Sequence, residues 1–189
     1  MADWMPIFPL RVVLFPGSRL VLRIFESRYK AMLKDCEKNK KPFGIVFTQH
    51  EEGDERVHMA SVGCVASIVE NAPFEDGTFM VQVEGMERFK INELDRDSKP
   101  YLLAQVETLR EDPDMPLEDP IHDSIETMLE VYRDLIMEVD PSMLAEVDEE
   151  HPMADLSYMA FEQMILPDEK RQEALETLST RKRHEMCLG

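Results

Sequence analysis

Alternating apolar and polar residues predict short β-strands in the first part of the chain. The runs with this alternation, or with nearly continuous apolar residues, lie at positions 20–24, 43–47, 62–69, 79–91 and 102–109. The run at 62–69 is apolar at nearly every position, which predicts a strand buried on both faces. Asp76-Gly77 predicts a hairpin turn because this pair tolerates positive φ, and Gly85 predicts a bulge. Five or six such strands predict a small barrel.

One helix is expected to interrupt these strands. Its apolar residues follow the i, i+3, i+4, i+7 spacing of an amphipathic helix at Tyr29, Met32, Leu33 and Cys36. Ser27 precedes them and is expected to cap the helix start. Lysines at positions 38, 40 and 41 are expected near its end, where positive charge complements the helix dipole.

Helical periodicity replaces the alternation after a proline-rich stretch at 112–116. Asp119-Pro120 offers an N-cap and an N1 proline, and an apolar stripe runs from 121 to 139. Start signals recur at Asp140-Pro141, His151-Pro152 and Pro167-Asp168, so four or five helices are expected. The sequence therefore predicts an α+β chain with a strand-rich domain over 1–111, a linker over 112–119 and a helical bundle over 120–189.

Charge is spread unevenly along the 189 residues, whose formal net charge is −18. Positions 1–110 hold 15 basic and 17 acidic residues, whereas positions 111–189 hold 6 basic and 22 acidic ones. An acidic surface repels phosphate, so nucleic acid and anionic membrane are disfavoured as partners. The same argument predicts basic, apolar polypeptides as the preferred clients.

Compartment and chemistry are indicated by features that the sequence lacks. The N-terminus shows no secretory signal, no apolar run is long enough to span a bilayer, and three widely spaced cysteines favour a reducing cytoplasm. No Gly-Lys pair, Gly-x-Ser-x-Gly or His-Glu-x-x-His occurs. We therefore expect a cytoplasmic protein that is not an enzyme and that holds no metal or cofactor.

A series of short motifs resembles the N-terminal substrate-binding domain of Lon proteases across nearly the whole chain. The motif residues are Pro9, Leu10, Arg11, Phe15, Pro16, Gly17, Phe25, Glu26, Arg28, Tyr29, Gly63, Gly77, Gly85, Arg88 and Phe89. Pro100-Tyr101-Leu102 and Leu166-Pro167 also fit. Three residues separate Pro-Leu-Arg from Phe-Pro-Gly, and Cys64 stands where the family often has threonine. Both departures favour the stand-alone, single-domain members.

The resemblance implies a PUA-like β pseudobarrel followed by a helical bundle. It also implies recognition of unfolded or tagged polypeptide, or of a partner in a protease system, without the ATPase loop and the Ser–Lys dyad of full-length Lon. For the motif residues we prefer a structural role in turns, bulges and internal ion pairs.

Candidate polypeptide-binding residues come from the methionine supply and from isolated aromatic residues. The chain has 14 methionines, and methionine suits surfaces that accept varied apolar partners. Met80 and Met86 have the parity opposite to the expected buried face of their strand, so exposure is expected. Trp4, Phe74 and the loop at 50–59 are the other candidates.

Two other classes of function remain open at this point. PUA-like barrels elsewhere bind RNA, although no basic patch with interleaved aromatic residues stands out here. A small-molecule pocket in the barrel, or at its junction with the helices, is the third class. The sequence does not indicate an oligomeric state.

Overall fold

The computed structural model describes residues 4–50, 57–112, 119–140 and 155–189. The chain divides into two compact units, Met1–Leu109 and Arg110–Gly189. Within the described residues the fold is mixed α+β, with one six-stranded sheet and five helices. The sheet and the first helix belong to the first unit, and the other four helices belong to the second.

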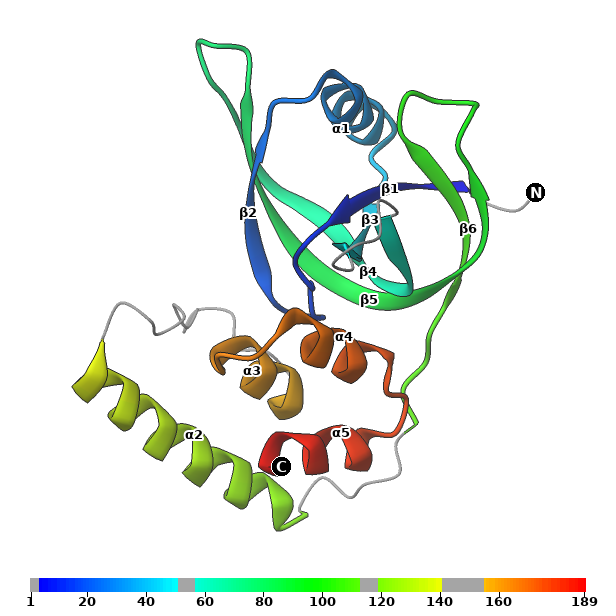
Figure 1. The fold of residues 1–189 in the computed structure, drawn as a ribbon. Helices are drawn as coiled ribbons and strands as arrows, with labels where there is room; N and C mark the ends of the chain where they lie inside the picture. The colour runs from blue at the N-terminus through cyan, green and yellow to red at the C-terminus, as the bar shows by residue number, and fades with distance from the viewer. Residues whose placement is uncertain (1–3, 51–56, 113–118, 141–154) are drawn as a thin grey trace. The chain divides into compact units, whose positions relative to one another are not determined.

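The sheet of the first unit closes on itself (Figure 1). Its strands run in the order β2-β5-β4-β3-β1-β6, and β6 also pairs with β5. Strand β2 pairs with the first half of β5 and β6 with its second half, while β4 pairs along the other edge. The strands are β1 Trp4–Leu10, β2 Arg19–Ile24, β3 Phe43–His50, β4 Val57–Pro73, β5 Phe79–Asp95 and β6 Leu102–Thr108.

Strands β4 and β5 are longer than the sequence pattern predicts, because bulges let them bend without ending. Register shifts occur between Cys64 and Ala66 and between Ile68 and Glu70 of β4. The prediction that 62–69 is buried on both faces is wrong for its last part, since Val69 is 48% exposed. From Val69 onward β4 forms, with the start of β5, a hairpin arm that ends at the β4–β5 turn. That turn is confirmed, with Gly77 at a φ of 74°.

Helix α1 (Ser27–Asn39) packs against the core of the first unit with the face that the sequence predicts. Its four apolar residues are all buried in one core with side chains of β1, β2, β3, β4 and β5. The expected cap is wrong, because Ser27 is already the first helical residue and Glu26 occupies the N-cap position without a side-chain hydrogen bond. Lys40 ends the helix in the left-handed conformation, with a φ of 50°.

Strand β1 is absent from the sequence prediction because two prolines interrupt its pattern. Proline cannot donate a hydrogen bond to a neighbouring strand, so it argues against a central strand. The structure accommodates both prolines by dividing the pairing: Pro6 lies opposite Leu103 of β6, and Pro9 lies opposite Val46 of β3. Each proline therefore needs a partner on one edge only.

The second unit is built from helices α2 (Ile121–Val139), α3 (Leu156–Gln163), α4 (Asp168–Glu176) and α5 (Thr180–Leu188). The predicted start of α2 is one residue too early, because Pro120 and not Asp119 occupies the N-cap position. The carboxylate of Asp119 still accepts a hydrogen bond from the amide of Ile121 at 3.1 Å. The start at Pro167-Asp168 is confirmed. The signals at Asp140-Pro141 and His151-Pro152 involve residues 141–154, which lie outside the described residues, as does most of the expected linker.

A buried arginine links α5 to α3 and to the end of α4 in the second unit. The side chain of Arg183 on α5 has no exposed surface and forms ion pairs with Asp155 at 2.6 Å and Glu111 at 2.9 Å. It also donates to Ser157 Oγ at 2.7 Å and lies 4.2 Å from the centre of the Tyr158 ring. A charge buried in this way is stabilised only while its partners are present.

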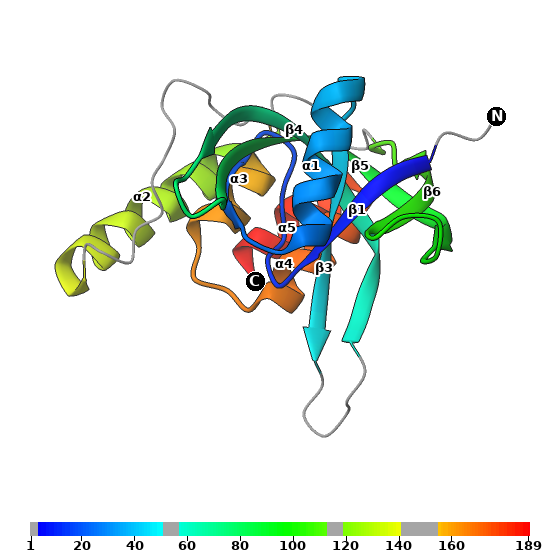
Figure 2. The same cartoon turned by 90° about the horizontal axis from the view of Figure 1, so that it is seen from above.

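None of the helices in the described segments is both long and apolar enough to cross a membrane. Figure 2 shows the sheet from above, with β3 and β4 extending side by side beyond the other strands.

Candidate functional site

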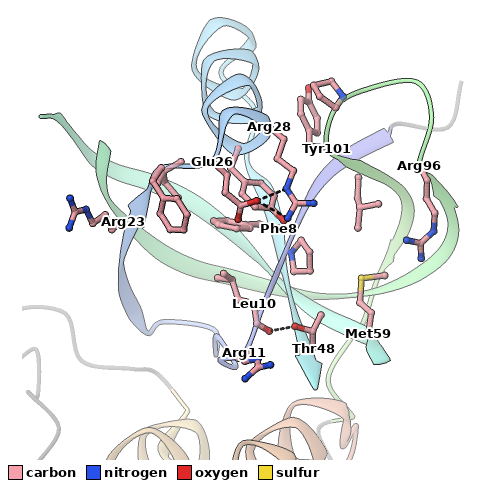
Figure 3. A pocket seen from close by; sticks show the side chains of 16 residues that line it. Phe8, Leu10, Arg11, Arg23, Glu26, Arg28, Thr48, Met59, Arg96 and Tyr101 are labelled. Atoms are coloured by element: carbon pink, nitrogen blue, oxygen red, sulfur yellow. Dashed lines mark hydrogen bonds and ion pairs between the residues drawn. The ribbon is translucent and has the colours of Figure 1, made fainter. Parts of the chain in front are cut away.

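The first unit contains a pocket of about 850 Å³ between the end of β1 and the start of α1. We call it the β1–α1 pocket. Its walls are formed by Phe8, Pro9, Leu10, Arg11, Arg23, Ile24, Phe25, Glu26, Arg28, Tyr29, Thr48, Met59, Arg96, Pro100, Tyr101 and Leu102. Figure 3 shows these side chains around the cavity. The pocket thus combines the first two strands, the helix start, β3, β4 and the loop between β5 and β6.

The floor of the pocket is apolar and rigidly packed. The rings of Phe8 and Tyr29 stack with centroids 4.1 Å apart, and both side chains are buried. Ile24 is buried beside them. Phe25 differs, because 65% of its surface is exposed although it lines the pocket. An exposed aromatic ring beside a buried aromatic floor is a surface that an apolar ligand can cover.

Hydrogen bonds hold two walls of the pocket in place. The hydroxyl of Thr48 on β3 donates to the carbonyl oxygen of Leu10 at 3.0 Å and so fixes the end of β1. On the opposite wall, Asp35 of α1 accepts hydrogen bonds from the Tyr101 hydroxyl at 2.6 Å and from Lys99 at 3.0 Å. These bonds attach the β5–β6 loop to the helix.

The two tyrosines that line the pocket, Tyr29 in the floor and Tyr101 in a wall, are held neutral. Burial raises the pKa of Tyr29, with a smaller opposing effect from Arg28. Burial also raises the pKa of Tyr101, and its hydrogen bond to Asp35 adds to this effect. The same hydrogen bond lowers the pKa of Asp35, helped by Lys99. Neither phenol is therefore poised to lose a proton near neutral pH, and the site offers packing and hydrogen bonding rather than acid–base chemistry.

The rim of the pocket is basic. Four arginines, Arg11, Arg23, Arg28 and Arg96, line it together with one acidic residue, Glu26. Glu26 accepts a two-pronged interaction from Arg28 at 2.8 and 2.9 Å. The net charge of the pocket lining is therefore positive, whereas the net charge of the chain is negative.

The structure separates the family-motif residues into two groups. One group, Pro9, Leu10, Arg11, Phe25, Glu26, Arg28 and Tyr29, lines the pocket. In the other group, Gly17 donates a backbone hydrogen bond to Gly85 at 2.8 Å, and Phe15 and Phe89 are buried. Arg88 is buried as well, Gly63 packs against the Phe89 ring, and Gly77 lies in the hairpin turn. A Cβ on Gly85 would lie 2.1 Å from the carbonyl oxygen of Phe15, so no larger residue fits there.

The four candidate polypeptide-binding residues do not line the pocket. Trp4 is half-buried on β1, and Phe74 is 48% exposed beside the β4–β5 turn. Met80 is half-buried on β5, whereas Met86 on the same strand is 53% exposed. Residues 51–56 of the loop proposed with them lie outside the described residues, but Met59 at its end lines the pocket.

Sequence reasoning missed three lining residues, Phe8, Thr48 and Arg96. Phe8 stands between two prolines in the strand that was not predicted. Thr48 and Arg96 belong to segments whose composition is ordinary for a strand end and a polar loop, so no local signal marks them. The closure of the sheet brings these residues together, two from its strands and Arg96 from the β5–β6 loop.

The described residues give no support for a metal site or for a reactive thiol. Among the described residues no group of three or more histidine, cysteine, aspartate or glutamate side chains could hold a metal ion. The three cysteines are free and buried. Burial raises the pKa of Cys36 to about 11, and those of Cys64 and Cys187 to about 12, which disfavours the reactive thiolate.

Comparison with known proteins gives one family over residues 4–189, the ATP-dependent protease La (LON) substrate-binding domain. The match is to this domain and not to an ATPase or a protease domain. The Lon protease of Anaeromyxobacter dehalogenans is 28% identical over 97% of this chain and 22% of its own length. The Lon protease of Parabacteroides distasonis is 31% identical over 82% of this chain and 18% of its own length. The chain thus spans about a fifth of the length of these relatives.

Solved structures agree with this match in fold. A Lon N-terminal domain protein from Xanthomonas campestris superimposes with a TM-score of 0.70 and 23% identity, over 98% of this chain and 97% of that one. The N-terminal domain of Lon protease from Mycobacterium avium complex gives a TM-score of 0.72 with 14% identity, over 98% and 96% of the two chains.

Proposed function

Because the chain belongs to the family of Lon substrate-binding domains, we propose that it is a non-catalytic recognition module that binds unfolded polypeptide in the β1–α1 pocket. One observation carries the proposal: motif residues of the family line a pocket with an apolar floor and an exposed aromatic ring, Phe25. Folded proteins bury most large apolar side chains, so an apolar pocket selects chains that expose them.

The size of the pocket suits this role. Ligand pockets usually measure about 300–1,000 Å³, and this one of about 850 Å³ accommodates apolar side chains from a short segment. Burial of apolar surface stabilises the complex by about 25 cal/mol per Å². Ordering a flexible chain opposes this gain, so we expect affinities on the order of micromolar.

The finer architecture is part of the same proposal. We infer a PUA-like pseudobarrel from the ring of paired strands in the first unit, and a helical bundle from α2 to α5 in the second, where α5 packs against α2 and α3. We also infer two domains, with the change from one to the other between residues 109 and 120, and a cytoplasmic location that suits three free cysteines.

A small-molecule ligand is a weaker alternative, because the charged groups do not converge on one point. In Figure 3 the side chains of Arg11, Arg23 and Arg96 lie on different sides of the cavity. A compact ligand needs a few polar groups that point to the same place. A polypeptide segment can instead meet separated groups along its length.

Calorimetric titration with a reduced, permanently unfolded model protein and with its folded form tests the proposal. We expect binding of the unfolded form only, with a negative heat-capacity change from apolar burial. Equal binding of both forms, or of neither, would contradict client recognition.

A matched pair of variants locates the site. Phe25→Ser and Phe74→Ser each remove one exposed phenylalanine of the first unit, but only Phe25 lines the pocket. We expect Phe25→Ser to weaken binding about tenfold, because loss of an aromatic contact residue that contributes ~1.4 kcal/mol to the binding free energy raises Kd by that factor. We expect Phe74→Ser to leave the affinity unchanged. The reverse result would move the site to the hairpin arm.

A further inference from the structure

The β1–α1 pocket concentrates positive charge in a strongly acidic chain. Its lining holds four arginines and one glutamate, a net charge of +3, whereas the whole chain carries −18. The first unit, which contains the pocket, is itself nearly neutral, with 14 basic and 17 acidic residues in 1–109, so its composition alone predicts a mixed lining. The positive charge of the pocket lining therefore needs its own explanation.

Two of these arginines are available to a ligand. Arg28 is engaged by Glu26 at 2.8 Å, and Arg23 by Asp76 at 3.1 Å. Arg11 and Arg96 are exposed, and neither forms an ion pair with another described residue.

The acidic residues beside Arg96 in the sequence do not neutralise it directly. Asp95 accepts hydrogen bonds from the backbone amides of Asp97 and Ser98 at 2.9 and 3.0 Å, so its carboxylate is used within the loop. Neither Asp95 nor Asp97 lines the pocket.

The positions of the two available arginines decide which anion fits. Arg11 follows the end of β1, and Arg96 lies in the β5–β6 loop, on another side of the cavity in Figure 3. The same pocket contains the apolar floor formed by Phe8 and Tyr29. Because the two guanidinium groups lie on different sides of the cavity, a ligand with two separate carboxylates suits them better than a ligand with one.

From this arrangement we propose that the β1–α1 pocket selects polypeptide segments in which acidic side chains flank an apolar residue. The apolar side chain packs on the floor, and the flanking carboxylates pair with Arg11 and Arg96. Arginine suits this task because its planar fork binds carboxylate with two parallel hydrogen bonds. The start of α1 lies at the same pocket, and the positive end of its dipole adds to the field. The inference rests on the proposed function and names the class of client.

Fluorescence anisotropy with four labelled peptides tests this selection at low salt. The first carries glutamates on both sides of a Leu-Phe pair and has an amidated C-terminus. The second replaces the glutamates by glutamines, the third replaces them by lysines, and the fourth is the glutamine peptide with a free C-terminal carboxylate. We expect the glutamate peptide to bind about five- to tenfold more tightly than the glutamine peptide, since exposed ion pairs contribute about 0.2–1 kcal/mol each. The difference should shrink at high salt.

Charge-matched double variants assign the effect to the pocket. Arg11→Gln with Arg96→Gln should abolish the preference for glutamate over glutamine. Lys90→Gln with Arg110→Gln removes the same charge from exposed residues outside the pocket and should preserve the preference. Equal loss in both double variants would overturn the proposed site, because the effect would then follow net charge alone.

The remaining outcomes separate this inference from the proposed function. Equal affinity for the glutamate and glutamine peptides would overturn the acidic selection and leave apolar recognition intact, whereas no binding of any peptide or of unfolded protein would overturn both. If only the fourth peptide bound tightly, the pocket would recognise a C-terminal carboxylate, and the proposal that it recognises acidic side chains would be overturned. A polyuridine oligonucleotide provides the last comparison. If it bound only when both arginines were present, while the affinity of every peptide was the same with and without them, the arginines would recognise phosphate and the peptide assignment would be overturned.

Discussion

The two units of the molecule use arginine in opposite ways. The first unit is nearly neutral, with 14 basic and 17 acidic residues in 1–109, and leaves Arg11 and Arg96 exposed at a pocket. The second unit is strongly acidic, with 7 basic and 22 acidic residues in 110–189, and buries Arg183 completely between carboxylates. The same side chain thus holds the core of one unit and is free to meet a ligand in the other.

This difference shows why net charge is a poor guide to ligand preference. The total of −18 predicts basic clients, because opposite potentials speed encounter. The charge that a bound ligand meets is that of the residues around it, and at the pocket this charge is positive. Long-range steering and local recognition can therefore favour different ligands, especially where salt screens charges beyond about 10 Å.

The largest effect is expected from removing the buried arginine. Arg183→Met leaves Asp155 and Glu111 without their cation. Both carboxylates are partly exposed, at 25% and 41%, so we expect a loss of about 2–3 kcal/mol, typical of losing hydrogen bonds to charged groups. Urea unfolding followed by circular dichroism should show earlier loss of the helices of the second unit. The single tryptophan, Trp4, lies in β1 of the first unit, so its fluorescence reports that unit separately.

The control for this variant is Lys170→Met, which removes an exposed lysine that pairs with Glu173 at 2.8 Å. Exposed pairs contribute about 0–1 kcal/mol, so little change is expected. Similar destabilisation by both variants would mean that burial does not distinguish the two ion pairs.

A somewhat smaller effect is expected in the first unit from Gly85→Ala. The added Cβ would lie 2.1 Å from the backbone oxygen of Phe15, and this oxygen belongs to the turn that Gly17 ties to Gly85. Overpacking of this kind costs about 1–3 kcal/mol. Urea unfolding followed by Trp4 fluorescence should shift to lower denaturant, with the helical signal of the second unit unchanged.

Gly77→Ala is the matched control, because nothing lies within 4 Å of the added atom and only the φ of 74° opposes it. The cost of that backbone conformation alone is about 1 kcal/mol. If the two alanine variants unfold at the same urea concentration, the close approach of Phe15 and Gly85 has no energetic consequence.

Much of the fold could be predicted from the sequence because short stretches of residues determine it. The spacing of Tyr29, Met32 and Leu33 predicts the buried face of α1, and Asp76-Gly77 predicts the β4–β5 turn. Strand β1 could not be predicted, since Pro6 and Pro9 hide its pattern and only pairing on alternate edges accommodates them. The cap of α1 was assigned one residue too late because Ser27 is a better capping residue than Glu26.

The site was less accessible to sequence reasoning because it depends on the closure of the sheet. The family motif contains seven of the sixteen lining residues, including Arg11 and Phe25, but nothing in the motif distinguishes these residues from Gly85 and Phe89, which pack inside the unit. Arg96 comes from a loop far along the chain. Only the pairing of β6 with both β1 and β5 brings it to the same cavity as Arg11.

The smallest effect is expected from Glu162→Gln on α3, and its pH dependence should reveal its cause. Burial raises the pKa of Glu162, and the attraction of Arg171 only partly offsets this. The folded state therefore binds the Glu162 proton more tightly than the unfolded state, whose pKa is about 4.3. Above the folded-state pKa the ionised carboxylate destabilises the second unit, and this penalty disappears as pH falls through the folded-state pKa toward the unfolded value.

Glutamine removes the penalty, so the variant should be more stable than the parent at pH 7, by about 0.5 kcal/mol, and equally stable below pH ~4. Helical unfolding in urea at several pH values measures the difference. A gain that grew as pH fell would require a lowered pKa and would contradict the partial desolvation of this half-buried carboxylate.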